Sequence, residues 1–233
     1  MTRGGCFDID TERAAAFAQA SGSTVMASAD EVIASSDMVY ICTWTSEHQS
    51  LVEKCIAAGK PFFCEKPLSI GLSQAAEMHT AATTSGLTHQ CGLILRRSPA
   101  YLWARELISD PAAGAPMAVV FRDDQFIPVQ GHYKSIWRGD VTKAGAGTLL
   151  EHSIHDVDML RFLIGDVESV SARATYRHEI EGIEDVVAAS IGFANGAVGT
   201  LTTIWHDNLS RPSLRNVEVF CENRTVVIAG DDW

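Results

Sequence analysis

The first 95 residues alternate short apolar runs with helical patterns of about 10–15 residues, and this rhythm constrains the fold more than any other feature. Helical patterns cover 11–20, 46–58 and 72–85. Apolar runs precede and follow them, as in "CFDI", "DMVYICT" (37–43), "PFFCE" (61–65) and "THQCGLIL" (88–95). Strands that alternate with helices of this length form βαβ units around a parallel sheet. We therefore predict an α/β fold for this part of the chain.

The rhythm changes after about residue 115. One helical segment remains at about 150–164, and strand-like runs separated by short turn signals follow it, including "DVVAASIGF", "GAVGTLTTIW" and "RNVEVFCE". Such spacing favours antiparallel pairing, and Asn195-Gly196 is typical of a tight primed hairpin turn. We predict two domains: an α/β domain over 1–95, and an α+β domain with an open, mainly antiparallel sheet over 96–233.

Charge and cysteine usage narrow the classes of partner. The sequence has 18 basic and 29 acidic residues, a net charge of −11, so nucleic acid is excluded as a general partner. No window approaches the ~18 unbroken apolar residues of a membrane span, and no basic-then-apolar leader opens the sequence. The six cysteines show no CxxC spacing and are scattered through apolar runs, which predicts reduced thiols and a cytoplasmic protein.

The ends of the predicted parallel strands carry the first candidate site residues, because ligands bind at the carboxyl ends of strands in open α/β sheets. Asp8, Thr43–Trp44 and Glu65–Lys66 follow three such strands. An acid after an early strand can bind both ribose hydroxyls of a dinucleotide, yet the companion GxGxxG is missing. Alternatively, Asp8 caps the following helix, and Ser46 with Gln49 forms a capping box.

A second candidate cluster lies on the helix predicted at about 150–164. Glu151, His155 and Asp158 stand at i, i+4 and i+7 and so share one helical face, where a carboxylate and an imidazole could act as acid and base. The alternative is a face of solvated charges. A metal site could also be formed by His152, His155 and Asp158. Their spacing matches no standard zinc motif, so we predict no metal site. Gly145 and Gly147 would let a backbone or a ligand approach closely.

Two segments together carry a family resemblance: "AGKPFFCEKPLS" (58–69) and "GAGTLLEHSIHDVD" (145–158). With "DIDTERAAAFA", "LRRSP" and "EDVVAASIGFANGAVGTL" in the family's order, the chain resembles the Gfo/Idh/MocA family of NAD(P)-dependent sugar and polyol oxidoreductases. The resemblance implies a Rossmann-type parallel sheet followed by an α+β domain. It also implies hydride transfer between NAD(P) and a hydroxyl carbon of a sugar, inositol or related polyol.

The resemblance assigns roles residue by residue. It places the Lys66 ammonium beside the nicotinamide and the substrate hydroxyl, and makes His155 the proton acceptor, the two converging on one small cleft. Glu151 stands where the family usually has Asp, and Asp158 would support the site. The acid at Asp8 favours NAD over NADP, with NADP as the alternative. The resemblance adds further cofactor contacts at Thr43, Trp44, His48, Glu65, Arg96, Trp137 and Arg138.

The family also begins with a strand and a GxGxxG turn, roughly thirty residues before the position of Asp8, and has closing strands and a helix beyond the position of Trp233. The 233 residues contain neither. We therefore expect a truncated Rossmann-type sheet, an incomplete second domain and a piece of a longer oxidoreductase. We also expect the 233-residue chain, expressed alone, to bind NAD weakly or not at all.

Competing functions and partners stay open at this point. A non-catalytic protein that senses NAD or a sugar on the same fold is the main alternative, and a metal-dependent hydrolase is a third. An open face of the antiparallel sheet would favour a dimer or tetramer. We expect substrate specificity to come from loops such as 124–136, where His132, Tyr133 and Lys134 could bind a polyol or simply be solvated.

Overall fold

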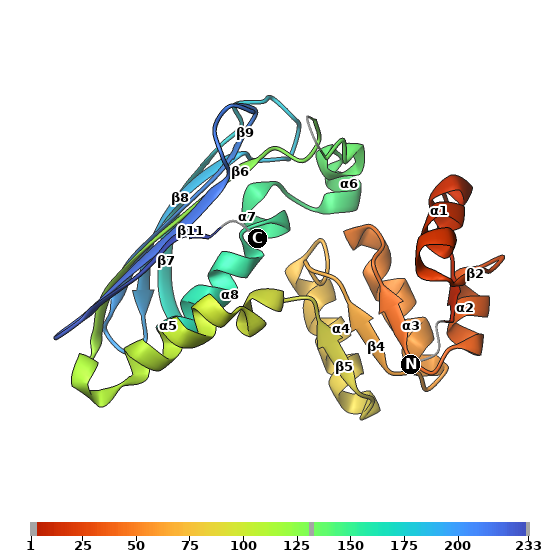
Figure 1. Cartoon of the computed structure of the whole chain (residues 1–233), viewed down its shortest axis with the longest axis horizontal. Helices are drawn as coiled ribbons and strands as arrows, with labels where there is room; N and C mark the ends of the chain where they lie inside the picture. The colour runs from red at the N-terminus through yellow and green to blue at the C-terminus, as the bar shows by residue number, and fades with distance from the viewer. Residues whose placement is uncertain (1–3, 131–132, 232–233) are drawn as a thin grey trace. The chain divides into compact units, whose positions relative to one another are not determined.

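The structure is a computed structural model that describes residues 4–130 and 133–231 (Figure 1). The chain falls into two compact units, one up to Gly92 and one from Leu93 onward. His132 lies outside the described residues.

The first unit contains two small parallel sheets. Strand β1 (Gly5–Cys6) pairs with β2 (Thr24–Val25), and β3 (Val39–Ile41), β4 (Phe62–Cys64) and β5 (His89–Cys91) form a second sheet in that order. All of these pairings are parallel, as the alternation of strands and helices predicts. The strands are shorter than the apolar runs in the sequence, because only two or three residues of each run join the ladder.

Helices connect these strands: α1 (Thr11–Ser21), α2 (Ala29–Ser35), α3 (His48–Ala57) and α4 (Leu72–Ser85). The Asp10 carboxylate caps α1 by accepting the N–H groups of Glu12 and Arg13, and Gly22 ends the helix in the left-handed region. The core of the unit includes Ile41, Val52 and Cys64. The predicted helix over 72–85 is confirmed.

The helix predicted over 46–58 begins later than expected. A 3₁₀ turn, η1 (Thr45–Glu47), precedes α3, which starts at His48. The capping box is also wrong: the Ser46 hydroxyl donates to Glu47, and the Gln49 amide donates to Glu53. Because both side chains are bonded elsewhere, neither of them caps α3.

The second unit is built on a six-stranded sheet. Its strands are β6 (Pro116–Phe126), β7 (Val167–Thr175), β8 (Val186–Phe193), β9 (Val198–His206), β10 (Leu214–Cys221) and β11 (Thr225–Asp231), in the order β11-β10-β6-β9-β8-β7. Every neighbouring pair is antiparallel except β6 and β9, which are parallel. The prediction of a mainly antiparallel sheet is confirmed.

Helices α5 (Pro99–Ser109) and α8 (Ile154–Leu163) lie along one face of this sheet (Figure 1). Tyr101, Met159, Phe121 and Leu201 are buried in the core between them. Residues that point to the other face, such as Val120 and Val198, are about half exposed. Edge strand β7 is exposed along its whole length. The unit therefore presents one uncovered sheet face.

Short helices complete the second unit: η2 (Ile94–Arg97), η3 (Pro111–Ala113), η4 (Ile136–Gly139), α6 (Val141–Ala144) and α7 (Thr148–Glu151). The continuous helix predicted over about 150–164 is wrong, because His152 and Ser153 separate α7 from α8. We call residues 151–155 the α7–α8 junction. Among the described residues, no helix is both long and apolar enough to span a bilayer.

The β8–β9 hairpin forms at Asn195-Gly196, as predicted, but its turn is not a primed one. A type I′ turn needs positive φ at both central residues. Gly196 has a positive φ of 88°, but Asn195 does not. Among the described residues, the non-glycine residues with positive φ are Lys134 and Glu179. The Asn195 side chain instead accepts from the backbone N–H of Ala197 and donates to the carbonyl of Ile164.

Candidate active site

Lys66 lies in a turn directly after β4, and three strand ends of the first unit fix that turn. The N–H of Glu65 donates to the carbonyl of Ile41 at the end of β3 (2.9 Å), and the N–H of Gly92 donates to that of Cys64 (2.8 Å). The N–H of Lys66 donates to the Glu65 carboxylate (3.1 Å), and the Lys66–Pro67 peptide is cis. The "EKP" segment therefore begins at the carboxyl edge of the sheet, where ligands of α/β folds bind.

His48 ties this turn to the end of β3. Its imidazole is buried, with Nδ1 3.0 Å from the carbonyl oxygen of Pro67 and Nε2 3.3 Å from that of Thr43. Burial lowers the pKa of His48, and the two carbonyl oxygens oppose that shift only in part. The ring thus lies between two loop segments, and as a neutral imidazole it donates to one of the two carbonyls. Its predicted cofactor contact stays a prediction.

The remaining candidates of the first unit also lie at strand ends. Asp8 follows β1, and its carboxylate accepts the N–H of Asp10 (2.8 Å). Asp10 caps α1, so the reading of Asp8 as the helix cap is wrong. Thr43 is exposed, and Trp44 directly precedes η1. These positions alone do not show a bound cofactor, so the predicted cofactor contacts stay predictions for Asp8, Thr43, Trp44 and Glu65.

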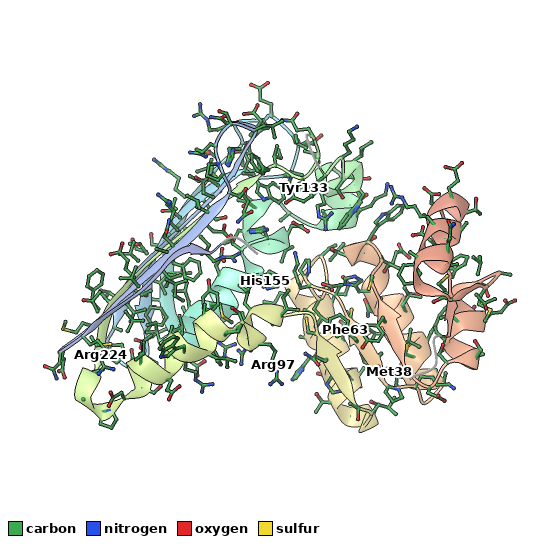
Figure 2. All side chains as sticks on the ribbon, viewed as in Figure 1. Met38, Phe63, Arg97, Tyr133, His155 and Arg224 are labelled. Atoms are coloured by element: carbon green, nitrogen blue, oxygen red, sulfur yellow. The ribbon has the colours of Figure 1, made fainter. Side chains whose placement is uncertain are left out.

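In the second unit, Glu151 and His155 flank the break between α7 and α8. Both side chains are buried, with residue exposures of 4% and 3%. A Glu151 carboxylate oxygen accepts from Arg138 Nε at 2.6 Å, and the guanidinium lies 4.4 Å from the centre of the Trp137 ring. Charge-assisted bonds of this length are strong. The structure thus brings three predicted residues, Glu151, Arg138 and Trp137, together, and Figure 2 shows His155 on the adjoining helix.

Asp158 supports α8 through a bidentate ion pair with Arg96. The Nε and Nη2 atoms of Arg96 lie 2.8 Å and 2.7 Å from the two oxygens of Asp158. The hydrogen bond to Asp158 raises the pKa of Arg96. Both residues belong to the second unit, so this pair fixes η2 against α8. Sequence reasoning placed Arg96 and Asp158 in the site but did not pair them.

The N-terminus of α7 depends on a residue that sequence reasoning missed. The two carboxylate oxygens of Glu184 accept the N–H groups of Gly147 (2.7 Å) and Leu149 (2.9 Å). An added Cβ at Gly147 would come 1.8 Å from the backbone oxygen of Glu184. Because Gly147 has no Cβ, the backbone of Glu184 can pack directly against it. Glu184 ends the turn signal "EGIE" and begins the segment "EDVVAASIGF", and neither pattern indicates a helix cap.

The predicted specificity loop 124–136 is partly strand. β6 continues to Phe126, and Asp124 and Gln125 are buried in it. Tyr133 and Lys134 are exposed, and Tyr133 appears in Figure 2 near the α6 end of this unit. The alternation of apolar and polar residues ends at Asp123, and for this reason the sequence suggests a loop there.

His152 contacts Asp123 at 3.0 Å. The described residues hold no group of three or more His, Cys, Asp or Glu side chains placed to bind a metal. Lys66 belongs to the first unit and His155 to the second. Their convergence therefore stays a prediction.

Comparison with known proteins places the chain in a family. Residues 4–93 match the "Oxidoreductase family, NAD-binding Rossmann fold", and residues 101–227 match the "GFO/IDH/MocA C-terminal domain". The chain is thus built from the two domains of an oxidoreductase fold. It belongs to the Gfo/Idh/MocA family.

Named relatives are about one-third identical to the chain in amino-acid sequence over the aligned residues. The chain is 32% identical over 194 residues to 1,5-anhydro-D-fructose reductase of Ensifer adhaerens, covering 80% of this chain and 57% of that protein. It is 32% identical over 192 residues to inositol 2-dehydrogenase of Cereibacter sphaeroides (strain ATCC 17029 / ATH 2.4.9), covering 80% and 54%. The chain thus spans about half the length of the curated relatives it matches.

Solved structures share the fold over nearly the whole chain. Levoglucosan dehydrogenase in complex with NADH superposes with a TM-score of 0.89 at 24% identity, covering 98% of this chain and 64% of that one. GenD2 from gentamicin A biosynthesis, in complex with NAD, gives a TM-score of 0.89 at 25% identity, covering 98% and 65%.

Proposed function

We propose that this protein transfers a hydride between NAD and a hydroxyl carbon of a sugar, inositol or related polyol, with NADP as the alternative cofactor. The observation that carries the proposal is the buried pair Glu151 and His155 beside Arg138, in a chain whose two parts match both domains of the family. Relatives named as inositol 2-dehydrogenase and 1,5-anhydro-D-fructose reductase support this substrate class.

The residues of the first unit fit a dinucleotide. The carboxyl ends of three parallel strands are followed by Asp8, Thr43 and Glu65–Lys66. Their carboxylate, hydroxyl and ammonium groups are of the kinds that would contact the ribose and nicotinamide of a dinucleotide. When bound, NAD⁺ supplies the hydride acceptor. Asp8 would hold the adenosine ribose, and the Lys66 ammonium would stabilise developing alkoxide character on the substrate oxygen.

The second unit would supply the proton chemistry. As the substrate carbon gives up its hydride, its O–H proton passes to the His155 imidazole, and the C–O bond becomes a carbonyl. Glu151, held by Arg138, would orient the site around that imidazole. The substrate's carbon is thereby oxidised by two electrons, and its two hydrogens leave as hydride and proton.

The test is steady-state kinetics of the full-length protein with NAD⁺ and a panel of inositols, anhydrosugars and aldoses, read as NADH absorbance. Lys66→Ala and His155→Ala should each lower kcat by about 10²–10⁴-fold. Lys60→Ala and His79→Ala, which change a half-buried lysine and an exposed histidine outside the candidate site, serve as matched controls. Near-normal kcat in both site variants contradicts the proposed roles, and NAD binding without turnover on any substrate would favour the sensor.

We also infer a homo-oligomer formed through the uncovered face of the six-stranded sheet. Val120, Val198 and Val227 are 45%, 59% and 56% exposed on that face. Exposed apolar side chains gathered on one sheet face mark a site of protein association. Light scattering should give a mass of two or four chains, and Val198→Lys should reduce it. A monomeric wild type would refute the inference.

We place the protein in the cytoplasm, because all six cysteines are free thiols, as a reducing compartment requires. Cell fractionation that recovers the native protein outside the cytosol would contradict this location.

A further inference from the structure

A cluster of ionisable side chains lies beneath the α7–α8 junction. It consists of Arg215 on β10, Asp123 on β6, Asp156 on α8 and His152 of the junction, and we call it the buried ion cluster. Arg215 Nη2 lies 2.9 Å from Asp123, and Arg215 Nε lies 3.0 Å from Asp156. The side chains of these three residues are 0% exposed. Removing charges from water is costly, so such a cluster calls for an explanation.

The cluster has one half in the sheet and one half at the junction. Arg215 and Asp123 are directly opposite in the β10–β6 register, so the sheet itself builds that pair. His152 reaches it from the junction, with Nε2 3.0 Å from Asp123, and Asp156 reaches it from the first turn of α8. These two residues stand three before and one after His155 in the chain. The cluster therefore holds the backbone on both sides of His155.

A second set of contacts pins the same segment to β9. The hydroxyl of Thr203 lies 2.8 Å from that of Thr148 and 2.5 Å from that of Ser153. All three side chains are buried. Because β10, β6 and β9 are consecutive in the sheet, the break between the two helices is anchored to three adjacent strands.

Burial and the neighbouring charges shift the pKa values of the two acids in opposite directions. Complete burial, with the Asp123 carboxylate nearby, raises the pKa of Asp156 well above its usual value. Burial opposes ionisation of Asp123 as well, but His152 and then Arg215 hold the pKa of that carboxyl below its usual range. Gln125 donates to the other oxygen of Asp123 at 2.9 Å. Of the two acids, Asp123 is therefore the more readily ionised and Asp156 the more readily protonated.

We propose that Arg215 is a positioning residue: it holds Asp156 and Asp123 together and thereby fixes the His155 imidazole at the α7–α8 junction. The proposal rests on the proposed function, because His155 is the proton acceptor there. Without the guanidinium, Asp156 loses its partner and the start of α8 can shift. A displacement of about 1 Å at a reacting group can cost about 10²-fold in rate.

The experiment compares Arg215→Met with Arg224→Met in the full-length protein. Arg224 is the matched control, because it also pairs with a carboxylate of the second unit, Asp110, at 3.0 Å. Figure 2 shows Arg224 at the far end of the sheet from His155. We expect Arg215→Met to lower kcat about 10²-fold while KM for the polyol and Kd for NAD change less than about threefold. Arg224→Met should retain the kcat of the wild type.

Amide hydrogen exchange followed by mass spectrometry gives a readout that needs no turnover. Arg215→Met should speed exchange in residues 148–157 relative to Arg224→Met, without a matching change in α5 or β8. If Arg215→Met does not fold, Thr203→Val removes only the hydroxyl contacts of the same junction. It should speed exchange in the same segment and lower kcat about tenfold.

The two proposals fail in different ways. A wild type that reduces no NAD⁺ with any polyol removes the proposed function, and the exchange data alone then decide the role of Arg215. Unchanged exchange in 148–157, or a kcat within about threefold of the wild type in folded Arg215→Met, overturns the positioning role. A fall in kcat with equal exchange changes throughout the second unit also overturns it, because that pattern reports general stability.

Discussion

The Lys66 turn and the α7–α8 junction, one in each unit, are held in place by different kinds of contact. The Lys66 turn relies on backbone hydrogen bonds at strand ends and on one neutral imidazole, that of His48. The junction relies on buried charges, a carboxylate cap from Glu184 and hydroxyl contacts to β9.

This difference predicts different tolerance to change. Loss of a neutral hydrogen bond costs about 1 kcal/mol, since water or a neighbour can compensate. Removal of one partner from a buried ion pair leaves an uncompensated charge and costs about 3–5 kcal/mol. The junction should therefore respond steeply to single substitutions and the Lys66 turn mildly.

The largest expected effect is at Gly147. Gly147→Ala would place a Cβ 1.8 Å from the backbone of Glu184, which has no room to move, so we expect a loss of about 3 kcal/mol or more in unfolding free energy. The matched variant is Gly92→Ala near the Lys66 turn. Its Cβ would meet the end of the Glu65 side chain at 2.7 Å, which can rotate away, so about 1 kcal/mol is expected. Urea unfolding measures both, and equal losses would break the comparison.

The next effect separates the two acids of the buried ion cluster. At pH 7, Asp123→Asn should cost about 3 kcal/mol and Asp156→Asn less, because the pKa of Asp123 is lowered in the folded state whereas that of Asp156 is raised. Stability should also depend on pH with opposite signs. The lowered pKa of Asp123 gives stability that is present above 3.8 and lost as pH falls below it.

The raised pKa of Asp156 gives stability that is greatest below 3.8 and decreases as pH rises, because the folded state binds the extra proton. The loss of unfolding free energy caused by Asp156→Asn should therefore be smaller at pH 7 than at pH 4.5. Chemical unfolding at these two pH values measures the difference. Equal costs for the two variants at pH 7 would show that both acids are ionised.

The smallest effect is at His48. Because its pKa is lowered in the folded state, the wild type should lose stability as pH falls below 6.5, where the unfolded chain takes up a proton that the buried ring excludes. His48→Gln should remove that slope and cost about 1 kcal/mol at pH 7. Thermal unfolding between pH 7.5 and 5.5, with His79→Gln as an exposed control, tests this. A steeper slope in His48→Gln would exclude the neutral ring.

Periodic patterns explain which parts of the fold are readable from sequence. Apolar runs and caps such as Asp10 and Gly22 locate strands and helices, since both signals act within a few residues. The break after Glu151 escapes such reasoning, because it is imposed by Arg215, Thr203 and Glu184, which are 30 or more residues away in the chain. The loop predicted from Asp124 is partly strand for the same reason: the partners of Asp124 lie on other strands.

The cap that Glu184 provides also bears on protein engineering. In the sequence, α7 and α8 look like one continuous helical segment. The N–H groups at the start of α7, however, are accepted by the carboxylate of Glu184, which is distant in the chain. A chimera that receives residues 145–163 alone would inherit the side chains without the means to orient them. Transplantation of this chemistry to another scaffold must carry the 180–184 segment as well.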